Sequence, residues 1–409
     1  MSRLQALRPA LPILIAASVM LTFAMGLRQS LGIFMPNLTK DLGMPVAQFT
    51  LAIAVQNLSW GILQPFAGAL AVRWGYRPLM VVGAVMYLIG LVLLATAQGI
   101  VAVVIGAGLA IGLAMSCTGP AMGMAVAARA VPASVRSTVL GIVSAAGSLG
   151  AMIAAPIGQV LMQWEGWRIG LVGFIVMALF MLPSAFIAGK GDKADAVPSA
   201  GAMGQLKASA ALREAAGSAP FVIMTIAYFV CGMQLIFLTT HLPAYLEICG
   251  MDPMLSAKVL GCIGAFNVLG SLFFGWAGGR WNKLLLLGMI YFLRSLALAW
   301  YFMTTPTETN TLVFGSIMGF LWLGVGPLVQ GWIVDRFGLR WQAMLGGVAF
   351  VSHQVGSFAG AFGGGVLFDS LGNYTLAWQI GVAVGLAAGI TQMLFAFVKE
   401  ATPMTPAAA

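Results

Sequence analysis

Arg28 is a cation inside a long, mostly apolar stretch of the sequence. Apolar residues dominate the flanking segments 16–26 and 31–35, and no acidic residue lies near it in the chain. Placing an arginine at the centre of a membrane span costs about 2.5 to 3.5 kcal/mol on insertion scales, so such a residue indicates a functional site. The planar guanidinium matches a carboxylate, and we therefore predict that Arg28 binds an anion, with Gln29 beside it. Alternatively, Arg28 bonds a backbone carbonyl or water and only holds its helix.

A second set of polar residues follows one helical face near the middle of the chain. Gln234, His241 and Tyr245 are spaced by seven and four residues, which places them on the same side of a helix. Aligning the segments 23–28 and 229–234 pairs Gln234 with Arg28. The two segments would then supply hydrogen bonds and charge to one ligand.

Further candidate site residues lie singly in other apolar stretches. They are Asn57, Asn267 and Arg294. Asparagine inside a membrane helix often bonds a neighbouring helix, and that reading stays open for Asn57 and Asn267. For Arg294, structural pairing or helix packing is the alternative to substrate contact.

The chain has only two histidines, and both fall inside or at the end of an apolar stretch. Histidine changes charge near neutral pH, so His353 and His241 are the candidates for proton coupling and for cargo contact. A neutral histidine that bonds a neighbour is the alternative for each. No carboxylate lies in the middle of an apolar stretch, so a coupled proton would move through histidine or on the cargo's own carboxylate.

The composition places the chain in a membrane. Hydrophobic residues make up 60% of the sequence, charged residues 8%, and the mean hydropathy is +0.98, which is too apolar for a water-soluble protein of this length. Only helices and closed barrels satisfy the backbone in lipid, and runs of about 20 apolar residues favour helices. We expect an all-α polytopic protein with twelve spans near residues 10–36, 46–72, 78–97, 100–128, 136–162, 168–188, 219–245, 255–279, 283–304, 309–334, 342–368 and 374–398.

The cations lie mainly on one side of these expected spans. Of the 20 lysines and arginines, only Lys40, Arg168 and Lys258 fall in the opposite loops, while Arg28 and Arg294 fall within spans. Short cytoplasmic loops retain lysine and arginine, so both termini are predicted to be cytoplasmic. This bias explains the formal charge of +9, and it gives no support to nucleic-acid binding.

The two halves of the chain repeat each other. Gly68, Arg73, Gly112, Gly119-Pro120 and Arg129 each find the same residue type 207 positions later, at Gly275, Arg280, Gly319, Gly326-Pro327 and Arg336. We therefore expect an N-terminal six-helix half at 1–189, a cytoplasmic linker at 190–218 and a C-terminal six-helix half at 219–409. In transporters built from such repeats, the substrate site lies near the bilayer midplane between the repeats.

The segment from Gly68 to Arg77 carries a family signature. Gly68, Arg73, Gly75 and Arg77 stand at the spacing of the loop between spans 2 and 3 of the major facilitator superfamily, which the chain resembles. The resemblance implies that these residues form a cytoplasmic gating loop. The position that is acidic in the family is Val72 here, so this chain must close its cytoplasmic side partly by other contacts.

Four segments resemble the prokaryotic branch of the monocarboxylate transporter family. They are Gly26–Gly32, Thr240–Leu246, Tyr291–Arg294 and Ser352–Ser357. Members carry small carboxylates, often with a proton, and bind the carboxylate with a cationic residue in span 1, where Arg28 stands. The family's second cation, in span 8, is absent, because Ser271 and Leu272 occupy that region.

These observations favour a secondary active transporter of a small organic anion, a monocarboxylate, working by alternating access and coupled to a proton as a symporter. The alternative is an efflux pump for amphipathic or toxic organic compounds, whose pocket the 25 methionines and 11 tryptophans could line. A membrane sensor is a third class. We expect a multi-pass protein of the bacterial inner membrane that works as a monomer, and no enzymatic activity, cofactor or metal site, since the four cysteines show no ligand spacing.

Overall fold

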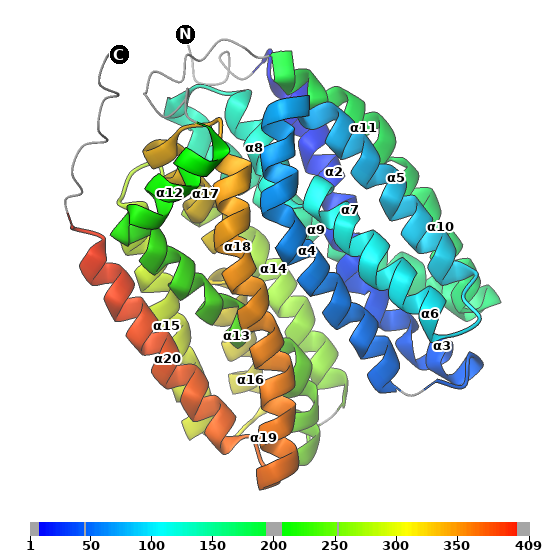
Figure 1. Ribbon diagram of the computed structural model, residues 1–409. Helices are drawn as coiled ribbons and strands as arrows, with labels where there is room; N and C mark the ends of the chain where they lie inside the picture. Colours follow the sequence, from blue (N-terminus) through cyan, green and yellow to red (C-terminus); the bar gives the residue numbers. More distant parts are fainter. Residues whose placement is uncertain (1–7, 45, 194–206, 252, 399–409) are drawn as a thin grey trace, which may run out of the picture. The chain divides into compact units, whose positions relative to one another are not determined.

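The computed structural model describes residues 8–44, 46–193, 207–251 and 253–398. The described residues form helices joined by short turns, with no strand among them. They fold into two compact units, Met1–Asp195 and Ala196–Ala409 (Figure 1). Much of the expected linker at 190–218, namely 194–206, lies outside the described residues.

The N-terminal unit contains the helices that cover the first six expected spans. The helices are α2 (Leu11–Ser30), η1 (Leu31–Phe34), α3 (Met35–Asp41), α4 (Val46–Trp74), α5 (Tyr76–Ala95), α6 (Ile100–Val103), η2 (Val104–Ala110), α7 (Ile111–Thr118), α8 (Pro120–Arg129), α9 (Ala133–Glu165), α10 (Trp167–Leu179), α11 (Met181–Ala188) and η3 (Gly189–Lys193).

The C-terminal unit begins with a short amphipathic helix and then covers the other six spans. Its helices are α12 (Ala208–Gly217), α13 (Ala219–Ile248), α14 (Pro253–Ala277), α15 (Lys283–Met303), α16 (Glu308–Phe320), α17 (Val325–Phe337), α18 (Gln342–Phe358), η5 (Ala359–Gly363), α19 (Gly364–Leu371) and α20 (Thr375–Phe395).

The expected fold class, an all-α bundle of twelve transmembrane helices in two six-helix halves, is confirmed. Ten stretches of helix in the described part of the chain are long and apolar enough to cross a membrane. The other two expected spans, 46–72 and 342–368, form α4 and the run α18–η5–α19. These two carry more polar side chains than the rest, among them Gln56, Asn57, Gln64, His353 and Gln354, and this lowers their mean hydropathy.

Glycine allows two pairs of helices to approach at backbone distance. A Cβ atom added at Gly150 of α9 would overlap the carbonyl of Thr22 in α2, and one added at Gly356 of α18 would overlap the carbonyl of Phe229 in α13. The two glycines are 206 residues apart and the two carbonyl residues 207. Each unit therefore closes its first and fifth spans by the same small-residue packing, which gives membrane helices their close contact; α13 and α18 run side by side in Figure 1.

Spans 4 and 10 are broken, and a neighbouring helix supports each break. Pro120 has no N–H to donate to the carbonyl of Ser116, and the side-chain nitrogen of Gln64 in α4 donates to that carbonyl instead, at 3.0 Å. In span 10 the break at 321–324 separates α16 from α17, and the side-chain oxygen of Asn267 in α14 accepts from the backbone N–H of Leu323 at 2.8 Å. Ser116 and Leu323 are 207 residues apart. In both halves, a side chain of a neighbouring helix therefore bonds the backbone at the same position of the repeat.

A charged cluster ties three connections of the N-terminal unit together. Asp41, at the end of α3, accepts from Arg168 at 2.5 Å and from the indole N–H of Trp167 at 3.1 Å. Arg168 also donates to the carbonyl of Ala97, at 3.2 Å, in the turn after α5. The hydrogen bond from Arg168, followed by that from Trp167, lowers the pKa of the Asp41 carboxyl.

The glycine packing gives a matched pair of variants. Gly150→Ala should lower stability by about 1 to 3 kcal/mol, because its methyl group would overlap backbone that cannot move aside. Gly264→Ala should leave stability unchanged or raise it slightly, since no heavy atom lies within 4 Å of the added Cβ and alanine favours a helix over glycine. Thermal unfolding in detergent measures both, and equal midpoints would contradict the packing.

The Asp41 cluster predicts a pH-dependent contribution to stability. A lowered carboxyl pKa stabilises the fold above the unfolded value of about 3.9, and this contribution disappears as the pH falls through the lowered folded value. Asp41→Asn should therefore lower the thermal midpoint at pH 7, and its difference from the unmodified chain should shrink below about pH 4. A difference that stays constant down to pH 3 would show that the charge of Asp41 is not involved.

Candidate functional site

Arg28 lies near the end of α2 and is held by side chains of α4. Its Nη2 donates to the side-chain oxygen of Asn57, and its guanidinium carbon lies 4.9 Å from the centroid of the Trp60 ring. The Nε–H is buried and finds no hydrogen-bond partner among the described residues. Arg28 also belongs to none of the three ion pairs formed by described side chains. A half-buried cation with an unused donor is thus presented by two neighbouring helices.

The supports of Arg28 are themselves fixed. Asn57 donates its side-chain N–H to the carbonyl of Ile53 at 3.0 Å, which turns its oxygen toward the arginine. The indole N–H of Trp60 donates to Gln64 at 3.0 Å, and Gln64 holds the broken span 4. Trp60 is 4% exposed, so the aromatic face under the guanidinium is locked in place by the same chain of bonds.

Trp60 was not predicted as a site residue. The spacing that could have found it is present, since positions 57, 60 and 64 follow each other by three and four residues on one helical face. Gln29, the residue predicted beside Arg28, is exposed. Of the predicted residues in the N-terminal unit, the structure therefore brings Arg28 and Asn57 together and leaves Gln29 outside their contact.

In the C-terminal unit, Gln234 faces the inside of the helix bundle. Its side-chain nitrogen lies 3.0 Å from both the hydroxyl of Ser295 in α15 and the carbonyl of Gly381 in α20. Only 2% of the residue is exposed, and its Oε1 has no partner among the described residues. Gln234 thus links the helices of spans 7, 9 and 12.

Arg294 is completely buried one residue before Ser295. Its Nη1 donates to the sulfur of Cys231 at 3.4 Å, and its guanidinium carbon lies 5.4 Å from the centroid of the Tyr291 ring. No surface of the residue is exposed, and neither Nε nor Nη2 has a hydrogen-bond partner among the described side chains and backbone. Structural pairing or helix packing was the alternative to substrate contact for Arg294, and its bond to Cys231 joins α15 to α13 without a carboxylate among the described residues.

His241 connects three segments of the C-terminal unit. Its Nε2 lies 2.9 Å from the carbonyl of Ala361 in η5, and its Nδ1 lies 3.3 Å from the hydroxyl of Tyr374. A carbonyl only accepts, so the hydrogen lies on Nε2 and a neutral ring accepts from Tyr374 through Nδ1. Gly364 leaves the space for the ring, because an added Cβ would contact Nε2 at 2.6 Å. Tyr245, four residues after His241 on α13, packs on Trp378, with ring centroids 5.8 Å apart.

His353 is half-buried and held among aromatic rings. It stacks on Phe350 at 5.1 Å and meets the edge of Tyr228 at 4.8 Å. Its Nδ1 lies 3.1 Å from the side-chain oxygen of Gln354 and 3.4 Å from the hydroxyl of Ser357. Protonation of His353 would therefore change a network within α18.

The residues predicted for the gating loop lie at the junction of α4 and α5. Gly75 has a φ of +89°, a conformation that favours glycine, and it forms the turn between the two helices. Arg73 is exposed and Gly68 is buried. Arg77 packs closely against Gly189, because a Cβ atom added at Gly189 would overlap the side chain of Arg77. At the start of α5, the guanidinium carbon of Arg129 lies 5.1 Å from the centroid of the Tyr76 ring.

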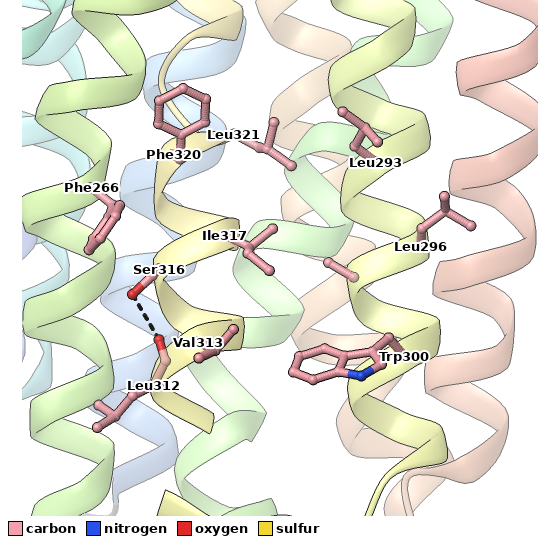
Figure 2. Close-up of a pocket in the computed structure, with 11 residues that line it drawn as sticks. Phe266, Leu293, Leu296, Trp300, Leu312, Val313, Ser316, Ile317, Phe320 and Leu321 are labelled. Atoms are coloured by element: carbon pink, nitrogen blue, oxygen red, sulfur yellow. Dashed lines mark hydrogen bonds between the residues drawn. The ribbon is translucent and has the colours of Figure 1, made fainter. Parts of the chain in front are cut away.

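None of these polar side chains lines an apolar groove of about 840 Å³ in the C-terminal unit. It is bordered by α14, α15 and α16, and Figure 2 shows side chains of α15 and α16 facing each other across it. Its one lining hydroxyl, on Ser316, donates to the carbonyl of Leu312 at 2.9 Å. The groove therefore suits an apolar occupant and offers no charged side chain to an anion.

Curated relatives of similar length are transporters. The chain is 24% identical to the uncharacterized MFS-type transporter YcxA of Bacillus subtilis, over 91% of this chain and 93% of that protein. It is also 24% identical to monocarboxylate transporter 13 of Rattus norvegicus, over 88% of this chain and 83% of that protein. Monocarboxylate transporter 11 of Mus musculus is 30% identical over a shorter segment, 39% of this chain and 35% of that protein.

Two solved structures with the same fold are sugar:proton symporters. The fucose:proton symporter of E. coli superposes with a TM-score of 0.73, at 16% identity, over 95% of this chain and 99% of that one. The proton:xylose symporter XylE gives a TM-score of 0.72 at 11% identity, over 94% of both chains. These likenesses show the fold alone. The sequence profile of the Major Facilitator Superfamily matches residues 14–361, and with the helical architecture described above this shows that the chain belongs to the major facilitator superfamily.

Proposed function

We propose that the chain is a secondary active transporter that carries a small organic anion, a monocarboxylate, across the bacterial inner membrane in symport with a proton. The observation that carries this proposal is Arg28, a cation in a membrane span that is braced by an amide and an indole and has no acidic partner among the described residues. A relative of similar length is a monocarboxylate transporter. Alternating access is the mode of transport expected for this family of folds.

The brace on Arg28 favours a charged ligand. Asn57 occupies Nη2 and Trp60 covers one face of the guanidinium plane, while Nε has no acceptor among the described residues. A carboxylate oxygen supplies both an acceptor for this N–H and the missing negative charge, and both effects are stronger in a low dielectric. A neutral ligand would supply only the acceptor.

The remaining predicted residues divide between two roles in this proposal. Gln234 and Asn267 already bond other helices, and we propose that they shape the transport path by fixing helix positions. Tyr245, His241 and Gln29 stay candidate cargo contacts, whereas we propose that Arg294, which has no exposed surface, does not contact the cargo. His353, half-buried beside Gln354 and Ser357, is the first candidate for the coupled proton, and His241 is the second.

The alternative function, efflux of amphipathic compounds, is favoured by one observation. The apolar groove bordered by α14, α15 and α16 offers about 840 Å³ without a charged side chain among its lining residues (Figure 2). An exporter of hydrophobic compounds could use such a wall. A ligand panel that contains carboxylates and apolar cations separates the two functions.

Arg28→Gln tests the anion anchor. The variant keeps a polar side chain that can bond Asn57 but loses the charge, so carboxylate binding should fall at least about 100-fold, because a hydrogen bond to a charged group contributes about 1.5 to 3 kcal/mol and the ion pair adds to it. Thermal stabilisation of the purified protein by a panel of small carboxylates, neutral analogues and hydrophobic cations measures the effect. Carboxylate binding that survives the substitution would remove Arg28 from the site, and stabilisation only by hydrophobic cations would favour the exporter.

His353→Ala tests proton coupling. If His353 carries the proton, uptake by the variant should lose its dependence on pH between about pH 5 and 8, while cargo binding at one fixed pH stays within about threefold. Uptake into proteoliposomes across this pH range measures it, with His241→Ala as the matched control. A pH profile that is unchanged in the first variant and flat in the second would transfer the role to His241.

A further inference from the structure

Arg294 is a buried cation for which the protein supplies no negative charge in the described part of the chain. Its exposed fraction is 0%, and the three ion pairs among described side chains involve other residues. Its one hydrogen bond goes to the sulfur of Cys231, at 3.4 Å, and a thiol sulfur is a weak acceptor. A charge of this kind is normally paired or neutralised.

The repeat shows that helix packing at this position does not require a charge. Arg294 stands 207 residues after Tyr87, and Cys231 stands 207 residues after Ala24. In the N-terminal unit the hydroxyl of Tyr87 donates to the carbonyl of Ala24 at 3.0 Å, so the same two positions meet through a neutral bond. A neutral side chain therefore suffices to join the two helices at this position, and the charge of Arg294 is not needed for that contact.

Several polar hydrogens on and beside Arg294 have no acceptor among the described residues. Both Nε and Nη2 of Arg294 lack a partner, and so does the hydroxyl of Tyr291, one turn earlier on the same helix, over whose ring the guanidinium lies. A water molecule could accept one of these hydrogens but would leave the positive charge in place. An anion satisfies both needs.

We propose that Arg294 and Tyr291 form a binding site for a small inorganic anion of the chloride class, enclosed between α13 and α15 of the C-terminal unit. The absence of exposed surface on Arg294 favours a monatomic ion over an organic carboxylate, whose carbon chain would need additional space. The site is separate from Arg28 in its residues and in its unit. The inference goes beyond the proposed function and holds whichever cargo Arg28 binds.

The experiment measures thermal unfolding of the full-length protein in detergent while chloride replaces gluconate at constant ionic strength. Chloride, and bromide in its place, should stabilise the unmodified chain with a saturable dependence. Arg294→Gln should abolish this dependence, and Tyr291→Phe, which keeps the ring under the guanidinium, should weaken the chloride affinity about tenfold by removing one donor. Arg28→Gln is the matched control and should keep the full chloride dependence while losing carboxylate binding.

Bromide also provides a direct measurement that does not depend on any variant. Crystals of the unmodified protein grown in bromide should show an anomalous peak beside the guanidinium of Arg294. Stability that does not respond to chloride, a chloride dependence that persists in Arg294→Gln, or a bromide peak elsewhere would overturn the inference. It would also fail if carboxylates but not chloride stabilise the protein through Arg294, because the residue would then be a cargo contact. If Arg294→Gln does not fold, Tyr291→Phe and the bromide peak decide.

Discussion

A positive charge within the hydrocarbon layer has to be compensated, and this requirement shapes both units of the protein. In the N-terminal unit, α4 provides an amide oxygen and an indole face for Arg28. In the C-terminal unit, Arg294 is enclosed with a sulfur and an aromatic ring. The ion pairs between described residues lie instead near the ends of the helices, as with Asp41 and Arg168. Two cations without acidic partners are therefore the main electrostatic features of the described spans.

The two units share their backbone contacts and differ in the chemistry placed on them. Glycines 206 residues apart bring the first and fifth spans of each half together, and the breaks in spans 4 and 10 are supported at positions 207 residues apart. Within this shared frame, Tyr87 in one half corresponds to Arg294 in the other. The repeat thus fixes helix packing by backbone contacts and leaves side chains at equivalent positions able to take different roles.

The fold class could be predicted from the sequence because the lengths of the apolar stretches and the repeat of 207 residues can both be read along the chain. The partners of Gln234 and Asn267 could not, because they lie on helices that are distant in sequence. The repeated Gly119-Pro120 is visible in the sequence. The hydrogen bond from Gln64 to the carbonyl of Ser116, which Pro120 leaves without its usual N–H donor, is not visible there because it joins two helices. Trp60 does not stand out as a site residue in the sequence, because aromatic residues are common in apolar helices. Its contact with Arg28 joins α2 to α4 and becomes visible only in the structure.

We propose that Arg28 on α2, held by Asn57 and Trp60, serves the transport of a small carboxylate. Counterflow in proteoliposomes tests it most directly, because exchange of a labelled solute against an unlabelled one needs neither a known coupling ion nor a known direction of transport. The purified protein should exchange at least one labelled monocarboxylate, and uncharged analogues of the same shape should not compete. Exchange of neutral or cationic amphiphiles with no exchange of any carboxylate would contradict it.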